Sequence, residues 1–80
     1  MKLYHISQDE ASGYDTWSDA VVCAESEDDA KTIHPWQYDD AWARNGGFWC
    51  KSPESVTAKY LGEAAPDLKR GIICSSFHAG

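Results

Sequence analysis

One stretch of this chain, Ser26 to Pro35 (SEDDAKTIHP), carries the signals that begin and end a helix. Ser26 suits the N-cap, because a serine oxygen accepts a hydrogen bond from a free backbone N–H of the first turn. The acids of residues 27–29 follow it, and carboxylates interact favourably with the positive end of the helix dipole. Pro35 predicts the end, since the residue before a proline avoids helical backbone angles. A chain with one helix of about two turns must build the rest of its core from strands.

Four other segments predict those strands. Lys2–Ser7 alternates between two faces, and Ala20–Ala24 is a short apolar run typical of a central strand. Ser55–Glu63 alternates like a half-exposed antiparallel strand, and Gly71–Phe77 is expected to be the last strand. Gln8–Asp19 is expected to be a polar loop. We therefore expect an α+β fold, a small mostly antiparallel sheet of about four strands with one short helix on a face, in the order β-β-α-β-β.

The length of 80 residues predicts a single domain, residues 1–80, with one small core. A single helix leaves the second face or an edge strand of the sheet incompletely covered, and homodimerisation would cover it. A homodimer is therefore one expectation. The chain has no apolar run long enough for a signal peptide or a membrane span, so we expect a soluble, cytoplasmic protein.

Charge is distributed unevenly along the chain. Ten acids and one base, Lys31, lie between Asp9 and Asp40, whereas three acids and five bases follow from Ala41 onward. The net charge of −6 disfavours direct nucleic-acid binding, which depends on neutralising phosphates. A basic protein surface is the better-matched partner.

Metal binding, cofactors and catalysis are not expected. The three cysteines are an odd number with no C-x-x-C pair, and the cysteines and histidines do not form the two closely spaced pairs that make a zinc signature specific. Cys23 and Cys74 are expected to be small core residues, and His34 is expected to interact with the helix dipole in the last turn. No serine or cysteine stands in a nucleophile-elbow context, and no glycine-rich loop follows a strand. We expect a protein that is not an enzyme.

Five aromatic residues fall between Trp36 and Trp49, interleaved with acids and bases. Tryptophan and tyrosine anchor protein interfaces, and carboxylates steer partners toward them. The alternative for the acids is a solvated helix cap, and for the aromatics a lid over the core, with Trp49 expected to be buried. The candidate partner-binding residues are Glu25, Asp28, Asp29, Asp39 and Asp40 as a negative patch, and Trp36, Tyr38 and Trp42 as anchors.

Two stretches, YDTWSDAVVCAESEDDAKTIHP and the C-terminal GIICSSFHAG, resemble a group of small phage and prophage proteins. In size, acidity and element order the chain is also similar to anti-CRISPR proteins, which are small inhibitors that bind a Cas surface. That resemblance implies a phage-encoded inhibitor that binds a subunit of a host CRISPR interference complex through an acidic surface. It would act as a DNA mimic and block target DNA binding.

A second hypothesis is a phage protein that binds or sequesters a small ligand such as a signalling nucleotide. The aromatic segment would stack the base, and basic residues would have to converge on the phosphates: Arg44, Lys51, Lys69 and Arg70. A phage accessory protein without an inhibitory role is a third possibility.

Overall fold

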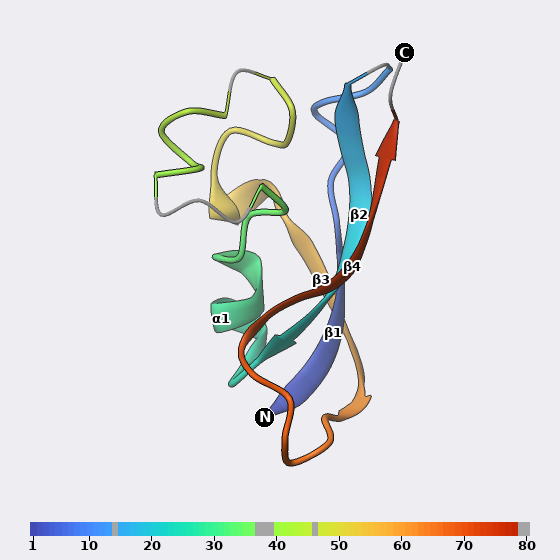
Figure 1. The fold of residues 1–80 in the computed structure, drawn as a ribbon. Helices are drawn as coiled ribbons and strands as arrows, with labels where there is room; N and C mark the ends of the chain where they lie inside the picture. The colour runs from blue at the N-terminus through green and yellow to red at the C-terminus, as the bar shows by residue number, and fades with distance from the viewer. Residues whose placement is uncertain (14, 37–39, 46, 79–80) are drawn as a thin grey trace.

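The computed structural model describes residues 1–13, 15–36, 40–45 and 47–78 of the chain. Four strands form one antiparallel sheet in the order β3-β1-β2-β4 (Figure 1). The elements are β1 (Lys2–Ser7), β2 (Thr16–Ala24), α1 (Glu27–Lys31), a 3-10 turn (Pro53–Ser55), β3 (Thr57–Glu63) and β4 (Gly71–His78). This arrangement confirms the expected α+β fold and the expected order of strands and helix.

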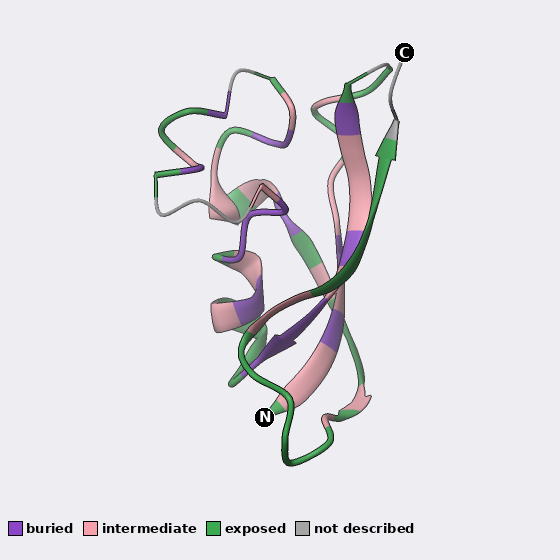
Figure 2. Cartoon of the chain, viewed as in Figure 1, coloured by how far each residue is buried: buried purple, intermediate pink, exposed green. Residues whose placement is uncertain are grey.

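The core lies between one face of the sheet and the segment that follows β2. α1 and the described residues of the connection that follows it (32–36, 40–45 and 47–56), together called the covering segment, lie on the same side of the sheet (Figure 1). The sheet contributes alternate residues of β1 and β2, and the covering segment contributes α1 and the chain near Trp49, as the buried purple positions of Figure 2 indicate. The buried cluster comprises Tyr4, Ile6, Ala20, Val22, Ala24, Ala30, Ile33, Trp49, Cys50 and Val56. Trp49 is 1% exposed, which confirms its expected burial.

The helix is shorter than the sequence predicts. Ser26 caps it as expected, because its hydroxyl oxygen accepts the Asp29 backbone N–H at 3.1 Å. However, α1 ends at Lys31, and Thr32 closes it with a backbone N–H bonded to the carbonyl oxygens of Ala30 and Asp29. Pro35 therefore lies beyond the helix and does not end it. The early end lets the chain turn toward the sheet and bury Ile33 and the residues after it.

β2 begins earlier than predicted, at Thr16. The polar residues Ser18 and Asp19 make this part of the chain look like a loop, but here β2 pairs with β4 at Trp17 and Phe77. The pairing is interrupted by a β-bulge. Trp17 lies opposite Phe77 and Asp19 opposite Ser76, so Ser18 is an extra residue in β2. Side chains of a strand alternate between the two faces of the sheet. The extra residue breaks this alternation, so Trp17 lies on the other face from the one it would occupy in a regular strand.

The other face of the sheet is open. It carries half-buried residues of the two central strands, among them His5 and Val21, next to Cys74 of β4. Cys74 is exposed, so its expected place in the core is wrong, whereas Cys23 is fully buried as expected. The reason is position in the sheet: β2 is central, with a neighbouring strand on each side, but β4 is an edge strand. Most of β4 is exposed in Figure 2.

Candidate binding site: an aromatic pocket at one end of the sheet

Four aromatic side chains enclose an open pocket of about 330 Å³: Trp17, Trp36, Phe48 and Phe77. Trp17 is its centre, because its ring centroid lies 4.8 Å from that of Phe77, 6.2 Å from that of Phe48 and 6.4 Å from that of Trp36. Phe48 and Trp36 also contact each other edge to face at 5.3 Å. These separations fall within the range that aromatic pairs prefer, so the walls of the pocket stabilise one another.

Two hydrogen bonds hold the Trp17 backbone. They are needed because β2 extends past the end of β1 here, and β1 no longer pairs with it. The Trp17 N–H donates to the carbonyl oxygen of Phe48 at 2.9 Å, so the covering segment takes the place of a neighbouring strand. The Gln8 side-chain amide donates to the Trp17 carbonyl oxygen at 3.0 Å. The bulge at Ser18 turns the Trp17 ring toward the covering segment, where Phe48 and Trp36 lie. The pocket thus depends on one irregularity in the sheet.

Asn45 organises the covering segment behind the pocket. Its side-chain oxygen lies 2.7 Å from His34 Nε2, its Nδ2 donates to the Trp49 carbonyl oxygen at 2.6 Å, and its own carbonyl oxygen accepts the Phe48 N–H at 3.0 Å. Asn45 and His34 are both buried. Because buried polar groups are costly when unpaired, this set of bonds specifies one path for the chain.

The hydrogen bonds of His34 assign its tautomer. The backbone N–H of Trp36 donates to Nδ1 at 3.0 Å, so Nδ1 is an acceptor and the proton resides on Nε2, which donates to Asn45. Burial lowers the pKa of His34 below its ordinary value, and the bond to Asn45 opposes that effect. The expectation that His34 acts at the end of the helix is therefore wrong. It is a neutral, buried residue that contacts Trp17 at 6.1 Å and Trp42 at 5.0 Å between ring centroids.

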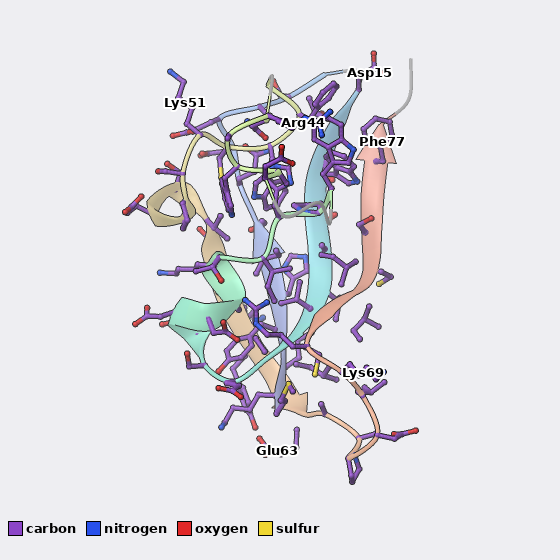
Figure 3. All side chains as sticks on the ribbon, turned by 60° about the vertical axis from the view of Figure 1, so that its left-hand side comes forward. Asp15, Arg44, Lys51, Glu63, Lys69 and Phe77 are labelled. Carbon is purple, nitrogen blue, oxygen red and sulfur yellow. The ribbon has the colours of Figure 1, made fainter. Side chains whose placement is uncertain are left out.

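Charge at the rim of the pocket comes from a pair four residues apart. The guanidinium carbon of Arg44 lies 5.6 Å from the ring centroid of Trp36, within the range of a cation–π contact. Asp40 lies 3.6 Å from an Arg44 nitrogen, and both side chains are more than half exposed. Arg44 and Phe77 lie toward the same end of the molecule in Figure 3, together with Asp15. Of the predicted residues, the structure thus brings Trp36 and Asp40 together through Arg44.

The acids at the start of α1 form a separate group. Glu25, Glu27 and Asp28 are exposed. Asp29 is engaged within the chain, because the Arg70 guanidinium donates to both of its oxygens at 2.8 to 3.0 Å. This interaction with Arg70 lowers the pKa of Asp29. Asp29 also accepts the Glu25 backbone N–H at 3.1 Å, so it binds the chain before α1 to the chain before β4.

Of the remaining predicted residues, Trp42 has a packing role. Trp42 is half-buried, stacks edge to face on His34 and donates its indole N–H to the Thr32 carbonyl oxygen at 2.8 Å. It therefore stabilises the covering segment. Tyr38 and Asp39 lie outside the described residues.

Sequence reasoning missed three of the four pocket residues. The sequence predicts Trp17 in a polar loop and Phe77 in the last strand, and it includes Phe48 in the aromatic segment but not among the candidate anchors. The available signal was the pair Thr16-Trp17, since β-branched and aromatic residues favour strands. The bulge that orients Trp17 had no signal in the sequence, because it depends on pairing with β4.

The open face carries one further polar pair. His5 Nε2 lies 2.8 Å from Asp19 Oδ2, between two neighbouring strands. Across the described residues, no three His, Cys, Asp or Glu side chains gather closely enough to hold a metal ion. No helix within the described ranges is long and apolar enough to cross a membrane.

Comparison with known proteins gave no relatives: no protein-family model, no curated protein and no solved structure matches this chain.

Proposed function

We propose that this protein is a phage-encoded, anti-CRISPR-type inhibitor that acts in the host cytoplasm. It binds a basic surface on a Cas subunit of an interference complex and blocks target DNA binding. Two features of the molecule support a protein partner: an aromatic pocket at one end of the sheet, and a group of exposed acids at the start of α1.

The aromatic pocket is the observation that carries the proposal. Interface hot spots are enriched in tryptophan. They lie in pockets that a partner side chain fills, and water is excluded from them. Trp36 and Phe48 are half-buried and Phe77 is 43% exposed, so the pocket can be reached from solvent while its walls stay packed. Trp17 also packs against the core, but exposed aromatic surface at Phe77 is costly, and a binding function explains its retention.

The acids supply the attraction to a basic surface. The protein has 13 acids against 7 bases, and Glu25, Glu27 and Asp28 are exposed at one helix end. Long-range attraction to a DNA-binding groove raises the association rate and decreases with ionic strength. Binding carried by both features should therefore weaken with salt, but should not vanish.

The test is binding to a purified interference complex with two variants of equal net charge. Glu25→Lys/Asp28→Lys changes the net charge from −6 to −2 (two substitutions of +2 each), and so does Glu54→Lys/Asp67→Lys, at exposed acids elsewhere. We expect at least a tenfold loss for the first pair and little change for the second. Equal losses would mean that only total charge matters, and no binding by the wild type would reject the proposal.

A nucleotide-binding function is the second candidate, and the position of Arg44 favours it. A guanidinium beside Trp36 is suitable for a phosphate when a base stacks in the pocket. A bound nucleotide raises the melting temperature by mass action. Melting curves with and without a panel of signalling nucleotides test this candidate: a shift that Trp36→Ala abolishes would favour it over the inhibitor, and no shift would reject it.

A further inference from the structure

We propose that two copies of this chain associate through β4, by antiparallel pairing of the outer edges of the two strands. The sequence raises the possibility of a homodimer but does not say which surface forms it. The structure assigns it to β4, on three observations: an unprotected edge, a self-complementary order of side chains, and opposite charges at the two ends of the strand.

The first observation is that β4 lacks the usual protection of an edge strand. It is last in the order β3-β1-β2-β4, and no segment within the described residues pairs with its outer edge. Edge strands are normally protected by charged residues, proline or bulges that interrupt pairing. The stretch Gly71–Phe77 (GIICSSF) has no charge and no proline, and its bulge at Ile73 lies near one end. It therefore presents a free backbone edge.

The opposite edge of the sheet makes the contrast. β3 carries Lys59 and Glu63, and a bulge at Leu61 interrupts its pairing with β1. Gly62 follows the bulge with a φ of 152°, a conformation that side chains rarely adopt. β4 also has a bulge, at Ile73, and a glycine of positive φ, Gly71 at 141°, so the difference between the two edges is the charge that β3 carries, which opposes addition of another strand. Of the two edges, β4 is the one open to pairing.

The second observation is that the side chains of β4 are complementary to themselves. Ile73 and Phe77 are 44% and 43% exposed, and three small residues separate them. When two such strands pair antiparallel around Ser75, each Ile73 lies opposite the Phe77 of the other copy. This register gives Ile73 and Phe77 of each copy one apolar cross-strand neighbour each. The register is therefore fixed with Ser75 at the two-fold axis.

The third observation is charge. Lys69 and Phe77 lie toward opposite ends of β4, and Asp15 is at the Phe77 end (Figure 3). Antiparallel pairing brings the Lys69 end of each copy to the Asp15 end of the other. The two ends are equivalent by symmetry, as an isologous interface requires, and because Asp67 lies two residues before Lys69 the attraction at each end is partial and long-range. They offset part of the repulsion between two chains of net charge −6.

Molar mass by light scattering over a wide concentration range is the first experiment. The wild type should reach twice the chain mass of 8.9 kDa. Ser75→Lys places two like charges across the axis and should give a monomer with an unchanged circular dichroism spectrum. Thr57→Lys, at an exposed position of the opposite edge, is the matched control and should remain a dimer. A wild type that is monomeric throughout, or a dimer lost in Thr57→Lys but not in Ser75→Lys, would overturn the proposal.

Disulfide trapping tests the register without relying on a destabilising charge. Residues directly opposite each other in an antiparallel pair have Cα atoms about 4.5–5.5 Å apart, within the range of a disulfide. Cys74→Ser/Ser75→Cys should therefore form a cross-linked dimer on mild oxidation. In wild type Cys74 lies opposite Ser76 of the other copy, and the two Cys74 residues are diagonal at about 7–8 Å, too far for a bond. Cross-linking through Cys74 and not through position 75 would contradict this register.

Discussion

At the scale of single residues, Asn45 and His34 decide whether the pocket keeps its shape. Asn45 holds the covering segment through three hydrogen bonds, and His34 packs against Trp17. We expect Asn45→Ala to lower the free energy of unfolding by about 2–4 kcal/mol, because it leaves His34 Nε2 and the Trp49 carbonyl oxygen buried without partners. Urea denaturation measures this value. A loss below about 1 kcal/mol would mean that water replaces the amide.

The lowered pKa of His34 predicts a dependence of stability on pH. The unfolded chain binds the proton more tightly than the folded chain, so the stability is complete above the ordinary value of 6.5 and decreases as the pH falls toward the folded-state pKa. Asn45→Asp places a carboxylate beside the ring, favours the imidazolium and should reduce this decrease. Melting temperatures measured between about pH 7 and pH 5 test the effect. An equal slope in both proteins would contradict it.

The three thiols should differ in reactivity. Cys23 and Cys50 are buried and Cys74 is exposed. Burial, assisted by the negative charge of Glu10, raises the pKa of Cys50 to about 11, which keeps it protonated near neutral pH. A thiol reagent should therefore label one cysteine in the folded protein and three after denaturation. Rapid labelling of Cys50 would show that the covering segment opens easily.

At the scale of elements, the interaction between Asp29 and Arg70 joins α1 to the chain before β4. Asp29→Asn removes the ion pair. Asp28→Asn changes the net charge by the same amount in the same helical turn and leaves the ion pair intact. We expect a loss of about 0.5–1 kcal/mol for Asp29→Asn and a smaller loss for Asp28→Asn, because the pair is partly exposed and screened. Thermal denaturation at low and high salt measures both. Equal losses would assign the effect to the helix dipole alone.

The strands show how far a sequence predicts elements. β1 and most of β3 and β4 have the alternation or the apolar run that their positions require, and their predictions are confirmed. The start of β2 was missed, because Ser18 and Asp19 are polar and the bulge at Ser18 arises from pairing with β4. The end of α1 was predicted too late, because packing of Ile33 ends the helix before Pro35 does. Local signals predict elements, and tertiary contacts set their limits.

At the scale of the whole molecule, net charge should limit stability. With a net charge of −6, repulsion between exposed acids outweighs the few ion pairs present among the described residues. We expect the melting temperature to rise as sodium chloride screens this repulsion. In Glu25→Lys/Asp28→Lys the rise should be smaller, since less repulsion remains to be screened. A decrease with salt in the wild type would mean that attractive pairs dominate.

The candidate site also shows what a sequence cannot assemble. Acids and aromatics that are close in sequence were predicted to form one surface, but the structure divides them. Trp36 lies in the pocket, Trp42 packs on His34, and Asp29 is bound to Arg70, 41 residues away. The pocket itself combines residues from β2, β4 and the covering segment. The pairing of β2 with β4 and the hydrogen bond from Trp17 to Phe48 bring them together, and no local pattern in the sequence reports either.

The strand order also determines when this protein can fold. β1, the first strand of the chain, pairs with β2 on one side and with β3, which begins at Thr57, on the other. A hairpin of β1 and β2 can form early, but the other edge of β1 pairs with a strand that lies about 50 residues further along the chain. Closing so long a loop makes folding slow. On the ribosome, β1 therefore waits as an open edge until the second half of the chain has emerged.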